Sequence, residues 1–196
     1  MSTQLFINAH IATGMPGSTA AETAAIQDIL VEDGKFISIA PHLKATLEAQ
    51  GKDMASVEVV DLGGKLVCPP FCDTHLHLDY VFTARKPGAV NESGTLFEGI
   101  QRWSETKADL TVDEIKERAK IGIAKEMRHG VQFIRSHADV TDPNLTSLKA
   151  LLELKEELKD TVTLQIVSFP QEGMYSYEGP HGESGADLVE IGRAHV

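Results

Sequence analysis

Residues 66–79 read Leu66-Val-Cys-Pro-Pro-Phe-Cys-Asp-Thr-His-Leu-His-Leu-Asp79, and this stretch decides the fold. Its apolar residues predict a strand over 66–73. Side chains two residues apart in an extended chain point the same way, so His75 and His77 are expected to project together from the strand end. Two neutral imidazoles in that arrangement can bind one divalent metal ion. Barrel enzymes keep their catalytic groups at this carboxyl end of a strand.

The sequence after this stretch alternates helix and strand signals. A short helix is expected over 96–104. Thr111 and Glu114 form a capping box that opens a second helix, which His129-Gly130 closes. A strand over 131–136 follows, then a helix that begins at Asp142-Pro143, and then a strand over 162–169.

This β-α-β-α-β order predicts an α/β fold with a parallel sheet. Polar residues follow each strand: His137 and Asp139 come after the second, and Gln171 and Glu172 after the third. Because several strands would then contribute to one shared site, a barrel is favoured over a doubly wound sheet.

The sequence before residue 66 shows a different pattern, in which strand and turn signals follow one another. It predicts a strand over 4–13, a hairpin over 28–40 turning at Asp33-Gly34, and a strand over 57–61. Residues 1–65 are therefore expected to form a small β unit, and residues 66–189 a separate one.

Composition excludes some classes of protein. The net charge of -11 argues against a nucleic-acid-binding protein, which would need a basic stripe. No apolar run approaches the roughly 20 residues of a membrane helix, and the N-terminus lacks the pattern of a signal peptide, so a cytoplasmic location is expected. Cys68 and Cys72 do not fit a redox or zinc motif, and they are expected to be buried strand residues.

Four blocks carry a resemblance to a known family. Residues 66–79 resemble the first-strand signature of the amidohydrolase superfamily, and residues 93–103, 134–140 and 164–173 resemble blocks of its bacterial cytosine deaminases, in the same order and spacing. The resemblance covers roughly residues 3–189. It implies a metal-dependent hydrolase on a (β/α)8 TIM barrel, of which this chain holds the first three β/α units, beside a small N-terminal β-sandwich portion.

The resemblance also implies roles for individual residues. His75 and His77 match the first two ligands of one divalent metal ion, iron or zinc. Gln171 matches a glutamine that hydrogen-bonds the pyrimidine ring, and Leu96 is expected to wall the substrate pocket. Four further residues are expected to have supporting roles. Asp79 would form hydrogen bonds behind the metal ligands, and His137 would pack or form hydrogen bonds. Glu172 would be structural or line the pocket, and Trp103 would pack in the core.

The implied reaction is hydrolytic deamination of cytosine to uracil and ammonia. The alternatives are a related aminohydrolase acting on an N-substituted triazine or another cyclic amidine, and a fragment without catalysis. The HxE and PCxxC signature of the other zinc nucleobase deaminases is absent from the sequence, so any such activity would use the barrel scaffold. The resemblance also implies a homo-oligomer.

The chain is expected to be the first part of a longer parent protein. In the family, a later histidine ligand, the proton-shuttling glutamate, a further histidine and an aspartate ligand follow on later strands, and no residue here matches them. Residues 190–196 depart from the family pattern and can be back-translated into the start of a sequencing adapter, so a non-native tail is expected there and His195 is not expected to bind metal. The chain alone is therefore expected to be inactive.

Overall fold

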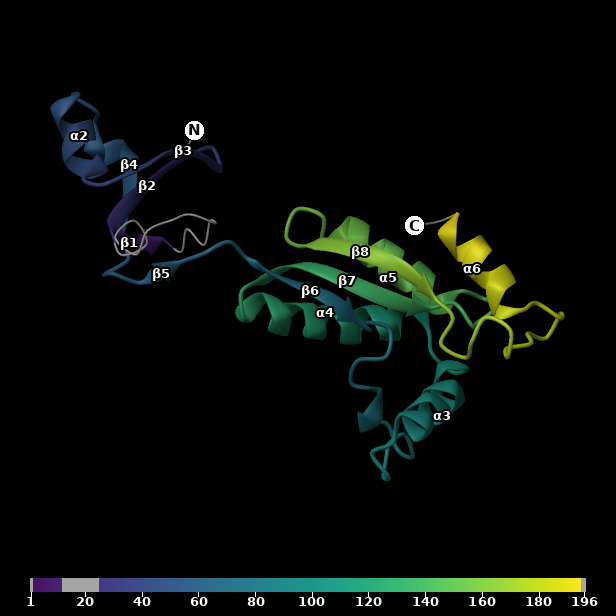
Figure 1. Cartoon of the computed structure of the whole chain (residues 1–196). Helices are drawn as coiled ribbons and strands as arrows, with labels where there is room; N and C mark the ends of the chain where they lie inside the picture. The colour runs from purple at the N-terminus through teal and green to yellow at the C-terminus, as the bar shows by residue number, and fades with distance from the viewer. Residues whose placement is uncertain (1, 12–24, 195–196) are drawn as a thin grey trace. The chain divides into compact units, whose positions relative to one another are not determined.

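The computed structural model describes residues 2–11 and 25–194, which form two compact units divided between Pro69 and Pro70 (Figure 1). The predicted division lay after residue 65. In the described part of the chain, no helix has the length and apolar character that crossing a membrane would require.

The first unit is one mixed sheet with a short helix. Its core is formed by Leu5, Leu30, Leu43 and Val57. The strand order is β3-β2-β1-β4, with β5 also paired to β1, and β1 runs parallel to both β4 and β5. The elements are β1 (Thr3–Ile11), β2 (Ile26–Glu32), β3 (Lys35–Ala40), helix α2 (Leu43–Ala49), β4 (Val57–Asp61) and β5 (Leu66–Val67), with a 3-10 turn at Met54–Ser56.

The predicted hairpin is confirmed, because β2 and β3 pair antiparallel around Asp33 and Gly34, which both have positive φ as a tight two-residue turn requires. The end of the predicted strand over 4–13, residues 12 and 13, lies outside the described residues. The described residues of this unit form a single sheet, so the second layer of a β-sandwich stays a prediction.

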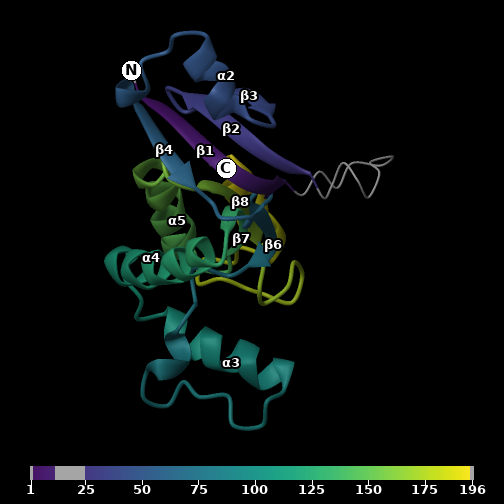
Figure 2. The same ribbon diagram turned by 90° about the vertical axis from the view of Figure 1, so that its left-hand side faces the viewer.

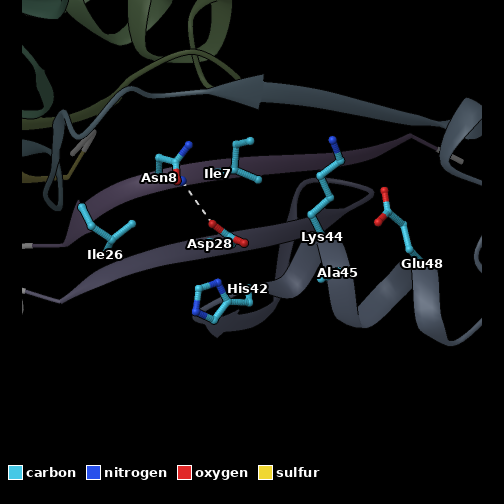
Figure 3. A pocket seen from close by; sticks show the side chains of 8 residues that line it. All are labelled: Ile7, Asn8, Ile26, Asp28, His42, Lys44, Ala45 and Glu48. Atoms are coloured by element: carbon cyan, nitrogen blue, oxygen red, sulfur yellow. Dashed lines mark hydrogen bonds between the residues drawn. The ribbon is translucent and has the colours of Figure 1, made fainter.

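The first unit also holds an open pocket beside α2 (Figure 3). Asp28 is its buried polar residue, and its carboxylate accepts a hydrogen bond of 3.1 Å from the backbone N of Asn8. Asn8 has φ 60 and lies where the register of β1 against β2 shifts. The Asp28 carboxylate therefore stabilises a β-bulge.

The second unit is a parallel three-stranded sheet, with strand order β6-β7-β8. Helices α4 and α5 pack along the sheet (Figure 2), and α6 packs against β8. This is the mixed α/β arrangement with parallel strands that the sequence predicts. The elements are β6 (Phe71–Leu76), α3 (Leu96–Lys107), α4 (Val112–Arg128), β7 (Val131–Asp139), α5 (Thr146–Glu157), β8 (Thr163–Phe169) and α6 (Gly185–Arg193), with a 3-10 turn at Thr83–Arg85.

Alternate residues of the sheet divide its two faces. Ile134, Ser136 and Ala138 of β7 are buried with Leu164 and Ile166 of β8 in the core that α4 and α5 cover. The opposite face carries Phe133, which is 44% exposed. Because the three strands are parallel, the carboxyl ends of β6, β7 and β8 all lie at the same edge of the sheet.

The predicted strand over 66–73 is wrong as a single element. Leu66 and Val67 form β5, which pairs with β1 in the first unit, whereas β6 begins at Phe71 in the second. Pro69 and Pro70 separate them, because proline has no backbone N–H to donate to a sheet.

The prediction that both cysteines are buried is also wrong, since Cys68 and Cys72 are both exposed. Cys68 lies in the connection between β5 and β6. Cys72 is in register with Phe133, on the sheet face that the helices leave open.

Several boundaries in the second unit differ from the sequence prediction, and two of the differences concern polar residues. Helix α5 begins at Thr146, not at Pro143, and the Asp142 carboxylate instead accepts hydrogen bonds from the backbone N of Asn144 and Thr146. Strand β7 continues to Asp139, so His137 and Asp139 lie on the strand and not after it.

The expected non-native tail covers residues 190–196. Residues 190–193 lie in helix α6, and residues 195 and 196 lie outside the described part of the chain. The origin of the tail stays a prediction.

The capping box is confirmed, with the Thr111 side chain accepting from Glu114 N and the Glu114 side chain accepting from Thr111 N. Thr111→Ala is expected to lower the free energy of unfolding by about 1 kcal/mol, because an N-terminal donor of α4 loses its partner. Chemical denaturation measures the change. Thr106→Ala is the matched control, since the Thr106 hydroxyl bonds only Arg102 O within α3. Equal losses in the two variants would contradict a specific capping effect.

Candidate metal and substrate site

His75 and His77 lie at the carboxyl end of β6. Their ring centroids are 5.3 Å apart. This short distance agrees with the expectation that the two rings project together from the strand end. His75 lies on the strand itself and is exposed, whereas His77 follows the last residue of β6 and is half-buried.

Neighbouring strands add two rings to this pair. His137 of β7 stacks on His75 with centroids 4.0 Å apart, and Phe169 at the end of β8 lies 5.2 Å from His77. Parallel pairing of β6, β7 and β8 explains the gathering, since it brings all three strand ends to one edge. Within residues 2–11 and 25–194, no three His, Cys, Asp or Glu side chains together have the arrangement of a metal site.

The ring of His77 is held in an orientation that suits a metal ligand. Its Nδ1–H donates to the backbone carbonyl of His137 over 2.9 Å, which leaves the Nε2 lone pair free. Metal-bound histidines commonly make such a second hydrogen bond. Burial lowers the pKa of His77, which favours the neutral ring that a metal ligand requires.

The loop after the histidines is fixed by buried polar groups. Leu78 N donates to Ser136 Oγ, and the Arg118 guanidinium donates to the carbonyl oxygens of Asp79 and Val81. The Asp79 carboxylate accepts from Asp139 N over 2.8 Å, and burial raises the pKa of Asp79 to about 7. Asp79 thus ties the histidine motif of β6 to the end of β7, consistent with its expected supporting place.

The two predicted substrate-binding residues, Leu96 and Gln171, line one pocket. Leu96 opens helix α3, and Gln171 follows the end of β8. The pocket wall also includes Tyr80, whose ring stacks on that of His77 with centroids 4.6 Å apart. Tyr80 therefore connects the pocket to the histidine pair. Burial raises the pKa of Tyr80 to about 12, so its phenol stays protonated.

Trp103 is buried as predicted, but it also lines this pocket and contacts Tyr80 at 4.8 Å between ring centroids. Glu172 is an ion-pair partner of Lys107 and accepts from Ser104 Oγ, which fits a structural place.

The sequence places Asp139 among the polar residues near the strand ends, but the sequence reasoning missed its partner Lys107, with which it pairs over 3.0 Å. Asp139 carries a local signal, because it is a charged residue that ends an apolar strand. Lys107 carries no such signal, because 32 residues separate the two partners.

Comparison with known proteins identifies the family of this chain. A sequence profile described as the amidohydrolase family matches residues 58–194. The crystal structure of 5-methylcytosine deaminase from Klebsiella pneumoniae with 5-fluorocytosine superposes with a TM-score of 0.77 at 38% identity, covering 97% of this chain and 41% of that one.

Two further relatives act on an ammelide, according to their names. N-isopropylammelide isopropyl amidohydrolase from Pseudomonas sp. (strain ADP) is 30% identical over 159 residues, which are 79% of this chain and 37% of the relative. The structure of N-isopropylammelide isopropylaminohydrolase from Burkholderia multivorans shares the fold, with a TM-score of 0.70 at 22% identity over 99% of this chain and 43% of that one.

The chain spans about two fifths of the length of these relatives, with values of 37% and 41% for the first two. Its parallel sheet is consistent with part of an amidohydrolase barrel. The matched residues include both histidines, the pocket residues Leu96 and Gln171, and all three strands of the second unit. The chain therefore belongs to the amidohydrolase family of metal-dependent hydrolases.

Proposed function

We propose that the parent protein hydrolytically deaminates cytosine or a close pyrimidine relative, and that this chain supplies the first two metal ligands and part of the substrate pocket. The observation that carries the proposal is one pocket containing both Leu96 and Gln171, joined through Tyr80 to His77. The 38% identity to a 5-methylcytosine deaminase over 97% of this chain supports a pyrimidine substrate.

His75 and His77 would hold one divalent ion, iron or zinc, since imidazole suits both metals. When bound, such an ion lowers the pKa of water and supplies a nucleophile near neutral pH. The remaining ligands and the proton-shuttling carboxylate are expected in the rest of the parent protein. His137 contributes the backbone carbonyl that orients His77.

Gln171 would recognise the edge of the pyrimidine ring. A side-chain amide offers a donor and an acceptor side by side, which matches a ring nitrogen next to a carbonyl. Leu96, Ile100 and the Trp103 ring supply apolar surface around it. We further propose that the parent protein is a cytoplasmic homo-oligomer whose partner is the small-molecule substrate, with neither nucleic acid nor membrane involved.

The alternative is an aminohydrolase of an N-substituted triazine, which the 30% identity to the Pseudomonas ammelide enzyme favours. The discriminating experiment is an assay of the metal-loaded parent protein on cytosine, 5-methylcytosine and N-isopropylammelide. Ammonia from the two pyrimidines is the expected product. Release of isopropylamine alone would support the triazine alternative, and no product from any of the three would contradict both.

Gln171→Leu in the parent protein is expected to lower kcat/KM for cytosine by about 10- to 100-fold, because the polar ring edge would lose its partner in the pocket. Steady-state kinetics measures the effect. Gln165→Leu is the matched control, since Gln165 bonds Arg135 and does not line the pocket. Similar losses in both variants would show that Gln171 does not contact the substrate.

A further inference from the structure

The buried carboxylate of Asp139 joins three segments of the second unit. Its Oδ1 accepts from the backbone N and hydroxyl of Thr141 at 2.8 and 2.5 Å, and from Gln171 N at 3.3 Å. Its Oδ2 accepts from Trp103 Nε1 at 2.6 Å and from Lys107 Nζ at 3.0 Å. Asp139 itself is 1% exposed. The partners come from α3, from the β7–α5 connection and from the loop after β8.

Two of these contacts lead to the substrate pocket, and a third leads to the neighbour of a pocket residue. Trp103 and Gln171 line it directly. Lys107 also donates to Thr141 O at 2.6 Å and forms an ion pair with Glu172, the neighbour of Gln171. The glutamate in turn accepts from Ser104 of α3 over 2.8 Å. Helix α3 and the Gln171 loop are therefore connected twice, once through Asp139 and once through Glu172.

Helix α3 has few other attachments. Trp103 is the one buried residue among its described positions, and Leu96 and Phe97 at its first turn are 73% and 82% exposed. Figures 1 and 2 both show α3 lying away from the sheet that carries the histidines. The polar contacts of Trp103, Ser104 and Lys107 therefore decide where this pocket wall lies.

We propose that Asp139 is a positioning residue that fixes the α3 wall and the Gln171 loop relative to each other, and so sets the affinity for substrate. The proposal rests on the function proposed above for this pocket. A carboxylate suits the task because one buried group accepts from donors on three segments at once. The Lys107 ammonium compensates its charge in a place where an unpaired charge would be costly.

The kinetic test is Asp139→Asn in the parent protein. The KM for cytosine is expected to rise about tenfold, the effect of losing one such hydrogen bond, with kcat within about threefold and metal content unchanged. Lys107→Met is expected to act in the same direction. The double variant is expected to be no worse than the more damaged single variant, because the two side chains act as one unit.

Lys116→Met is the matched control. Lys116 also forms a double ion pair, with Glu153 and Glu157, but it joins α4 to α5 away from the pocket. Its loss is expected to leave KM unchanged. A fall in kcat at constant KM in Asp139→Asn, or an equal KM effect in Lys116→Met, would overturn the positioning role.

Amide hydrogen exchange gives a readout that does not need turnover. In Asp139→Asn, exchange is expected to quicken in α3 and in residues 171–173 together, with α4 and α5 unchanged. Uniform quickening across the second unit, or no change, would overturn the proposal. If the wild-type protein turns over no substrate, the proposed function fails while hydrogen exchange still decides the role of Asp139. If Asp139→Asn does not fold, the same measurements on Lys107→Met decide it.

Discussion

His77→Ala in the parent protein is expected to lower kcat/KM for the proposed pyrimidine substrate by a factor on the order of a thousand or more, as removal of one member of a catalytic unit does. His77 is the better fixed of the two histidines, since its Nδ1–H is bound to the His137 carbonyl and its Nε2 is free. Alanine removes that donor, so metal content is expected to fall with activity. Steady-state kinetics and elemental analysis of the same preparation measure both.

The control for this variant is His129→Ala. His129 is an exposed histidine at the end of α4, and its Nδ1 bonds Lys125 O at the helix terminus. Its replacement is expected to leave activity and metal content unchanged. A His77→Ala protein that keeps its metal and its turnover would show that the histidine pair is not the metal site.

Residues 1–196 expressed without the rest of the parent protein are expected to release no measurable ammonia and to associate. No three candidate ligands form a metal site within the described residues, so the histidine pair has no third ligand among them. Strands β6 and β8 end the described sheet on its two sides, and Phe71 and Phe133 are 59% and 44% exposed. Open strand edges beside apolar surface favour association.

An ammonia assay and size-exclusion chromatography test this expectation, with the parent protein prepared in parallel as the positive control. The opposite result would be a monomer that melts cooperatively and deaminates cytosine. It would mean that the first three β/α units are sufficient for the site.

Features encoded by neighbouring residues could be predicted from the sequence. The Thr111–Glu114 capping box and the Asp33-Gly34 turn depend only on residues a few positions apart, and both form as expected. The proximity of His75 and His77 is of the same kind, because it follows from the alternation of an extended chain.

Features that depend on partners distant in the sequence could not be predicted. The parallel pairing of β1 with β4 joins residues more than 50 positions apart, and nothing local signals it. Leu66 and Val67 are apolar and directly precede β6, but they pair with β1. Only the tertiary structure therefore assigns them to the first unit. The Asp139–Lys107 pair was missed for the same reason, because each residue taken alone is an ordinary charged side chain and only the fold brings the two together.

The two exposed thiols complicate any count of bound ions. Thiolates are good ligands for zinc, and Cys72 lies on the same strand as His75. A zinc-loaded preparation could therefore carry adventitious ions at the cysteines, so that an apparent stoichiometry of one would not identify the histidines. Spectroscopy with cobalt on a Cys68→Ser/Cys72→Ser background removes this ambiguity, because charge-transfer bands from sulfur would then be lost while nitrogen ligation remained.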